Sequence, residues 1–157
     1  MKRMSVLAAA ALVLTGCLVL DTGRARERYV APEYADRLAR AVWILDSVEA
    51  QRELASPQIE ADAAYILRLL IARANQRADA GAGTLALRVR IKERGLPSDL
   101  RTRRTATVEI EAFASGDHPV AMALYSETTA HGARGVQSYT YLSGLLKRAL
   151  RQMGRTV

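Results

Sequence analysis

The chain has 157 residues, half of them apolar, and a formal net charge of +7 at pH 7. This length fits a single domain, and the apolar fraction excludes an intrinsically disordered chain. A lone cysteine cannot form an internal disulfide, so packing alone must hold the domain together. Aromatic residues make up only 5% of the sequence, which predicts an aliphatic core with closely packed helices.

The first twenty residues follow the design of a secretory signal. Lys2 and Arg3 supply a positive start, and an apolar run over 6–13 follows. The whole apolar stretch, 4–20, contains polar and small residues and ends at Asp21, so it falls short of the ~20 apolar residues that a spanning helix needs. We therefore expect a cleaved leader and not a stable transmembrane anchor.

The leader ends on Leu14-Thr15-Gly16-Cys17, which holds the only cysteine. This tetrapeptide resembles the lipobox of bacterial lipoproteins, in which an aliphatic and two small residues precede a lipidated cysteine. The resemblance implies that residues 1–16 are a signal peptide and that Cys17 carries acyl chains such as palmitate, which anchor the mature chain in a membrane. Leu18 stands where inner-membrane retention signals usually carry aspartate, so the resemblance implies an outer-membrane lipoprotein that faces the periplasm. The alternative is an ordinary secretory peptide with an incidental cysteine.

Residues 17–32 are interpreted as the lipidated N-terminus and a linker. The segment 21–32 is polar and shows no sustained period. Arg24, Arg26 and Arg28 would then rest on anionic headgroups, each contributing about 1 kcal/mol. The alternation of these arginines also allows an edge strand.

Two helices are predicted in the first half of the domain. Over 33–54, apolar residues recur at helical spacing, and Ser56-Pro57 then starts a second helix over 57–80 that Gly81 ends. Trp43, in the first of these helices, is either a core anchor or a platform for a ligand. The two apolar stripes consist of Tyr34, Leu38, Ala41, Leu45 and Val48, and of Ile59, Ala63, Ile66, Leu67, Leu70 and Ala74.

The period then changes from 3.6 to 2, which predicts strands. Apolar residues alternate with cations over 85–92 and with acidic residues over 105–113. Antiparallel pairing with Arg90 opposite Glu109 also sets Arg88 opposite Glu111 and brings the aliphatic side chains together on the other face. The arginines of this face are expected to neutralise its glutamates and not to bind a ligand.

A third strand is predicted after the turn at 115–119. Val120, Met122 and Leu124 alternate with Ala121, Ala123 and Tyr125, and the small side chains of the second set would let a helix or a partner approach closely. A helix over 137–153 follows, with its cations outward. Its inward residues are Tyr141 or Leu142, Leu145, Leu146, Ala149, Leu150 and Met153.

These elements predict one α+β domain over 33–157 in the order helix, helix, three strands, helix. The architecture expected is a two-layer sandwich in which a three-stranded antiparallel meander is covered by helices on its apolar face.

No catalytic or metal-binding constellation stands out. The two histidines, His118 and His131, lack ligand spacing to one another or to carboxylates, and a lipidated Cys17 is not available as a ligand. Ser143 and Lys147 are four residues apart, whereas a Ser-x-x-Lys hydrolase needs a spacing of three. We therefore expect a protein that is not an enzyme and needs no cofactor or metal.

The lipobox, the amphipathic meander and the C-terminal helix together resemble small LptE-like accessory lipoproteins of the cell envelope. The resemblance implies a non-catalytic assembly, accessory or transport-associated protein whose partner is another envelope protein, bound at the sheet edge or around Ala121, Ala123 and Tyr125. The alternative is a binder of anionic glycolipid or peptidoglycan, with Arg148, Arg151 and Arg155 as candidate contacts. Loss of Lys2 and Arg3 with the leader lowers the net charge from +7 to +5. Nucleic acid is not expected as a partner of an exported chain.

Overall fold

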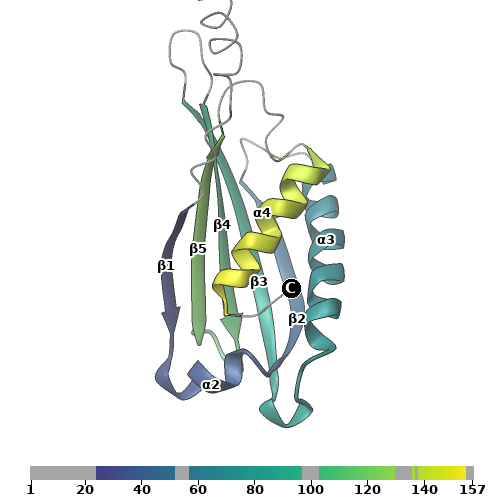
Figure 1. Ribbon diagram of the computed structural model, residues 1–157, viewed down its shortest axis with the longest axis vertical. Helices are drawn as coiled ribbons and strands as arrows, with labels where there is room; N and C mark the ends of the chain where they lie inside the picture. Colours follow the sequence, from purple (N-terminus) through teal and green to yellow (C-terminus); the bar gives the residue numbers. More distant parts are fainter. Residues whose placement is uncertain (1–23, 52–56, 97–102, 130–135, 137, 155–157) are drawn as a thin grey trace, which may run out of the picture.

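The computed structural model describes residues 24–51, 57–96, 103–129, 136 and 138–154. In chain order the elements are β1 (Arg24–Val30), η1 (Pro32–Tyr34), α2 (Ala35–Leu38), β2 (Val42–Ala50), α3 (Pro57–Asn75), η3 (Ala80–Ala82), β3 (Thr84–Leu96), β4 (Arg103–Phe113), β5 (Ala121–Thr129) and α4 (Tyr139–Gln152). The strands form one five-stranded sheet in the order β1-β5-β4-β3-β2 (Figure 1).

The predicted three-stranded meander with the order α-α-β-β-β-α is wrong. Strands β3, β4 and β5 do form an antiparallel meander, but β1 extends it antiparallel beside β5, and β2 extends it parallel to β3. The sheet is therefore mixed and has five strands. Strand β1 also occupies Arg24–Val30 of the predicted linker over 17–32, so the edge-strand alternative for its arginines is the one that the structure supports.

The predicted helix over 33–54 is a short helical turn followed by strand β2. A register shift between Leu45 and Ser47 changes which residues of β2 face the core. Trp43 and Leu45 lie opposite Leu85 and Leu87 before the shift, and Val48 lies opposite Val89 after it. Leu45 and Val48 are thus three positions apart on one face, which is also the spacing of a helix. Val42, Trp43 and Ile44, however, have the β-branched or aromatic side chains that strands favour.

The predicted pairing of the two charged strands is confirmed residue by residue. Arg90 lies opposite Glu109, and Arg88 lies opposite Glu111. The helix predicted over 57–80 is α3, which ends five residues earlier at Asn75, and the helix predicted over 137–153 is α4. At the start of α4, Leu142 is the buried residue of the two alternatives.

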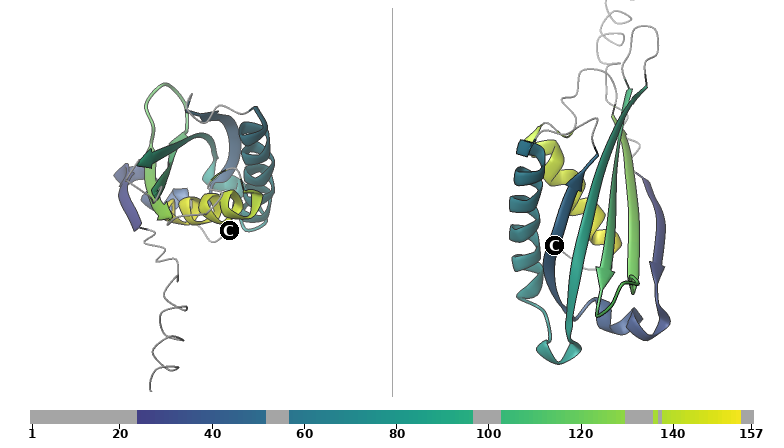
Figure 2. Two further views of the ribbon diagram at one scale, coloured as in Figure 1. Left: turned by 90° about the horizontal axis from the view of Figure 1, so that it is seen from above. Right: turned by 180° about the vertical axis from the view of Figure 1, so that it is seen from behind.

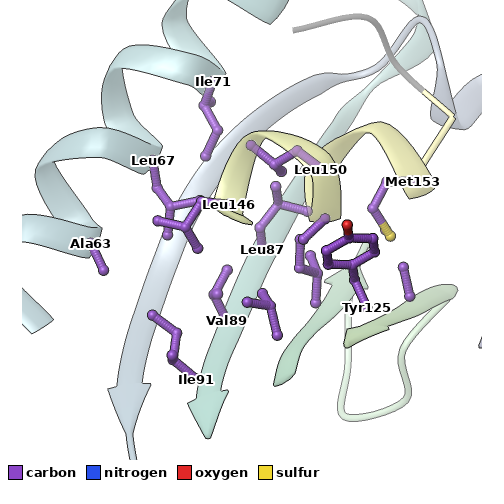
Figure 3. Packing of buried hydrophobic residues seen from close by; sticks show 14 of the residues in the cluster. Ala63, Leu67, Ile71, Leu87, Val89, Ile91, Tyr125, Leu146, Leu150 and Met153 are labelled. Atoms are coloured by element: carbon purple, nitrogen blue, oxygen red, sulfur yellow. The ribbon is translucent and has the colours of Figure 1, made fainter. Parts of the chain in front are cut away.

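Helices α3 and α4 lie on the same face of the sheet, which curves around them (Figure 2). Leu67 and Ile71 of α3 and Leu146 and Leu150 of α4 point toward Leu87 and Val89 of β3, as Figure 3 shows. All of these side chains belong to one buried apolar cluster, and Leu67, Leu87, Val89, Leu146 and Leu150 have no exposed surface. None of the helices in the described ranges has the length and apolar character needed to cross a membrane.

Helix α3 also protects the edge of the sheet that β2 forms. Asn75 accepts the backbone N–H of Trp43 at 2.9 Å and donates to its carbonyl oxygen at 2.7 Å, as a neighbouring strand would. At the other end of β2, Glu60 accepts the backbone N–H of Ala50 at 2.9 Å. Trp43 itself is fully buried and donates its indole N–H to the carbonyl of Leu38 at 3.1 Å, so it is a core anchor and not a ligand platform.

Candidate functional site on the open face of the sheet

The face of the sheet opposite α3 and α4, here called the open face, is not covered by any helix in the described ranges (Figure 2). Because side chains alternate along a strand, each row across the sheet brings residues from several strands together. One row runs from Arg88 on β3 through Glu111 and Met122 to Tyr29 on β1. The open face divides into a charged and an apolar part.

The charged part lies over β2, β3 and β4. Arg90 contacts Glu109 at 3.5 Å and Glu111 at 3.3 Å, and the side chains of these two glutamates are only 20% and 16% exposed. Arg88 bonds Asp46 at 2.8 Å, and this hydrogen bond raises the pKa of the Arg88 guanidinium above its ordinary value. The cations and carboxylates of this part therefore neutralise one another, as the sequence predicted for its arginines and glutamates.

The apolar part lies over β5 and β1. Tyr29 lies opposite Met122, and Leu124 follows two residues further along β5 on the same face. We call these three side chains the β1–β5 strip. Tyr29 is 51% exposed, whereas Met122 and Leu124 are half-buried. Glu27 lies opposite Leu124 on β1, and Glu109 and Glu111 lie opposite Leu124 and Met122 on β4, so carboxylates border the strip on both sides.

Strand β1 also forms an edge of the sheet. It pairs with β5 on one side, and no strand of the described ranges pairs with its other side. A register shift between Ala25 and Glu27 interrupts the pairing near its start, so the regular part of the edge runs from Glu27 to Val30. An edge strand can accept an added strand through its backbone groups. The β1–β5 strip and this edge lie side by side and form one continuous candidate contact surface.

The predicted partner surface around Ala121, Ala123 and Tyr125 is wrong. These residues are 0%, 1% and 4% exposed because they face α4, not a partner. The small side chains of Ala121 and Ala123 do let a helix approach closely, and that helix is α4 of the same chain. Met122 and Leu124, which alternate with these residues along β5, lie on the open face.

Of the candidate anionic-ligand contacts, Arg148 is already bound within the fold. Its Nε and Nη2 atoms donate to Glu127 at 3.1 and 2.6 Å, and the Glu127 side chain is 2% exposed. Partial burial of Arg148 disfavours its charged form, but the hydrogen bond and the charge of Glu127 outweigh this, and the pKa of Arg148 is raised. Arg151 is exposed on α4. Arg155 and the predicted lipidation site, Cys17, lie outside the described residues.

The described residues offer little for catalysis or metal binding. No group of three or more His, Cys, Asp or Glu side chains within the described ranges has a metal-binding arrangement. His118 is exposed in the turn between β4 and β5, and His131 lies outside the described residues. A shallow depression of about 200 Å³ between the ends of β2 and β3 is smaller than the ~300 Å³ of a typical small-molecule site.

No protein-family model matches the sequence, and no curated protein matches it. Solved structures that resemble the chain include the PelC dodecamer from Paraburkholderia phytofirmans in space group P6, with 16% sequence identity and a TM-score of 0.47. That likeness covers 86% of this chain and 99% of PelC. A point variant of the same dodecamer in space group C2 has 17% identity and a TM-score of 0.46, and the match covers 85% of this chain and 98% of the variant. A structural likeness at this level carries no information about the function of this chain.

The β1–β5 strip was not found from the sequence. Tyr29 lies in a segment whose period is broken by the register shift, and Met122 and Leu124 are more apolar than the alanines that alternate with them. The one available signal was the small side chains at 121 and 123, since a helix packs more closely on alanine than on methionine or leucine.

Proposed function

We propose that the protein is a lipid-anchored, non-catalytic accessory protein of the cell envelope that binds another envelope protein through the β1–β5 strip and the free edge of β1. The observation that supports the proposal most directly is the exposure of Tyr29 beside Met122 and Leu124 on a sheet face that no described helix covers. The proposed location is the periplasmic face of the outer membrane, and it rests on the lipobox resemblance at Cys17 and on Leu18.

The chemistry of the strip defines the partner. An added strand beside β1 would gain backbone hydrogen bonds, and its side chains would alternate between the two faces of the sheet. Those on the open face would continue the strip next to Tyr29, so they should be apolar. A Lys or Arg of the partner would pair with Glu27, the carboxylate that borders the strip on β1. The partner is thus an envelope protein with an extended segment that carries apolar residues at every second position and a flanking Lys or Arg.

Site-specific photo-crosslinking in cells tests this proposal. A photoreactive phenylalanine replaces Tyr29 in one variant, and in the control it replaces Tyr65, which is 57% exposed on α3 on the other side of the molecule. We expect one defined adduct from position 29, identified by mass spectrometry as an envelope protein, and no such adduct from position 65. The additional change Leu124→Glu should abolish the adduct because it places a charge within the strip, two residues along β5 from Met122.

Three outcomes would contradict the proposed contact. Equal adducts from positions 29 and 65 would mean that crosslinking reports exposure alone. An adduct with twice the mass of the chain would mean that a second copy covers the strip. No adduct from position 29 at native expression levels would leave the strip without a partner, contrary to the proposal.

The lipid anchor has its own test. Metabolic labelling with radioactive palmitate should mark the wild-type chain, and Cys17→Ser should remove the label and leave an uncleaved or soluble product. A Cys17→Ser chain that is still processed at the same position and still fractionates with membranes would refute lipidation at this residue. The result does not depend on the strip, so the two parts of the proposal can fail separately.

A further inference from the structure

We infer that the partner's extended segment pairs antiparallel with β1 in one fixed register, held by the outward-facing backbone groups of Arg28 and Val30. We call these two residues the pairing positions. The inference rests on the proposed function and deepens it, because it states how the backbone of the partner is bound and which partner residue lies beside Tyr29. Residues 27–34, which determine this contact, all lie within the described ranges.

Alternate residues of β1 direct their backbone groups toward β5 and toward the free edge. In an antiparallel ladder, residues that exchange both backbone hydrogen bonds alternate with residues whose N–H and C=O groups point away from the neighbouring strand. Ala31 donates its backbone N–H to the carbonyl of Val120 at 2.8 Å, which sets the phase of this alternation. Tyr29 therefore bonds its partner on β5, whereas Arg28 and Val30 direct their N–H and C=O groups outward.

The free edge presents these groups over a short and bounded length. At its C-terminal end, the carbonyl of Ala31 accepts the backbone N–H of Tyr34 at 2.8 Å, and Pro32 has no N–H to donate. At its other end, the register shift between Ala25 and Glu27 interrupts the regular ladder. No strand of the described ranges pairs with this side of β1, so the N–H and C=O groups of both pairing positions are left for an added strand (Figure 1).

The spacing of the pairing positions favours an antiparallel partner. In antiparallel pairing, one partner residue exchanges both hydrogen bonds with Arg28, and a second residue, two positions away, does so with Val30. The partner residue between them lies opposite Tyr29 in a non-hydrogen-bonded pair, where the Cα atoms are about 4.5 Å apart and the side chains lie closest. Parallel pairing uses slanted bonds and is slightly less stable per residue. An apolar partner residue opposite Tyr29 would thus extend the β1–β5 strip by one strand.

This register defines a short recognition sequence in the partner. Read from N to C, it consists of any residue except proline, an apolar residue, any residue except proline, and Lys or Arg. The apolar residue lies opposite Tyr29, the cation lies opposite Glu27, and the other two positions must keep their N–H groups to bond the pairing positions. A second copy of β1 paired about Tyr29 would instead set Glu27 opposite Ala31, which carries no charge, so a different protein fits the edge better.

A proline at one pairing position tests the backbone contact. Val30→Pro removes an N–H that the pairing with β5 does not use, and an edge strand tolerates proline where the N–H faces solvent. The photoreactive phenylalanine stays at position 29, and expression is kept low enough that binding is unsaturated. We expect about 10-fold less adduct, because one hydrogen bond is lost and the carbonyl of the partner is left without a donor.

The matched control is Val30→Ala, which shortens the side chain but keeps the N–H. Its adduct should stay within about 2-fold of that of the parent chain, as for an ordinary surface substitution. Thermal melts followed by circular dichroism show whether both variants keep the fold.

The direction of the partner strand is measured without any proline. One chain carries the photoreactive phenylalanine at position 27 and another carries it at position 29, and tandem mass spectrometry identifies the partner residue captured from each. Antiparallel pairing places the residue captured from position 27 C-terminal to the residue captured from position 29, whereas parallel pairing places it N-terminal. This order decides the inference even if Val30→Pro does not fold.

Three outcomes would overturn the inference. A folded Val30→Pro chain that crosslinks as well as Val30→Ala would mean that the partner packs on the β1–β5 strip without joining the sheet. The parallel order would refute the register, and an adduct with twice the mass of the chain would identify a second copy as the occupant. The first two outcomes leave the envelope partner at position 29 in place, whereas absence of any adduct from the parent chain would overturn the proposed function as well.

Discussion

Replacing Arg148 by methionine separates a structural role from a ligand-binding role for this residue. Arg148 donates two hydrogen bonds to Glu127, whose side chain is 2% exposed, so the substitution would leave a buried carboxylate without its main partner. Breaking a buried ion pair from one side costs about 3–5 kcal/mol. The Arg148 side chain keeps 39% of its surface exposed, so water would relieve part of this cost, and we expect a loss of about 2–3 kcal/mol in the free energy of unfolding.

Urea denaturation followed by circular dichroism measures this loss. For a domain of this size it corresponds to a fall of roughly 6–9 °C in the melting temperature. The double variant Glu127→Leu/Arg148→Met should recover most of the stability, because a well-packed apolar pair can replace a buried ion pair at little cost. The coupling free energy from the four proteins isolates the pair from other effects of each substitution.

The refuting result is equally specific. If Arg148→Met changes the free energy of unfolding by less than about 0.5 kcal/mol, the value typical of a surface substitution, and the double variant is simply additive, Glu127 does not depend on Arg148. Arg148 would then again be a candidate for binding an anionic glycan or lipid, and the alternative function would gain support.

Two further predictions concern the sheet. Ile110→Asp places a charge at a fully buried position of β4 and should prevent folding. Glu109→Gln, one residue away on the open face, should lower the free energy of unfolding by about 1 kcal/mol or less. Equal tolerance of both substitutions in thermal melts would refute the assignment of the two faces. Asn75→Ala removes both bonds to the backbone of Trp43 and should cost about 1–3 kcal/mol while increasing the exchange rate of the Trp43 amide hydrogen; an unchanged exchange rate would show that α3 does not protect this edge.

The sequence was most informative where an element keeps one period without interruption. Apolar and polar residues alternate through the whole predicted length of β3 and β4. The register is strongly specified, because a shift of one residue would expose every aliphatic side chain. Helix α3 was equally clear, since Pro57 begins it and its apolar stripe has few exceptions.

Register shifts account for the elements that the sequence did not predict. In β2 the shift after Leu45 joins two short alternating stretches into a pattern with helical spacing, and in β1 the shift after Ala25 removes any pattern over seven residues. In β5 both sets of alternating residues are apolar, so hydrophobicity alone could not distinguish them. The close approach of α4 decided the orientation in favour of Ala121 and Ala123, and for this reason the β1–β5 strip was not found in advance.

The pairing of β1 with β5 joins the first and the last strand of the sheet, with about ninety residues between them. Closing a loop of this length costs about 4 kcal/mol of chain entropy, so this pairing is expected late in folding. A chain that emerges N-terminus first from synthesis would hold β1 without its partner strand until β5 has followed it. Throughout this interval the backbone groups of β1 would be open to pairing with another extended chain, which makes β1 the strand most exposed to misassociation before the sheet is complete.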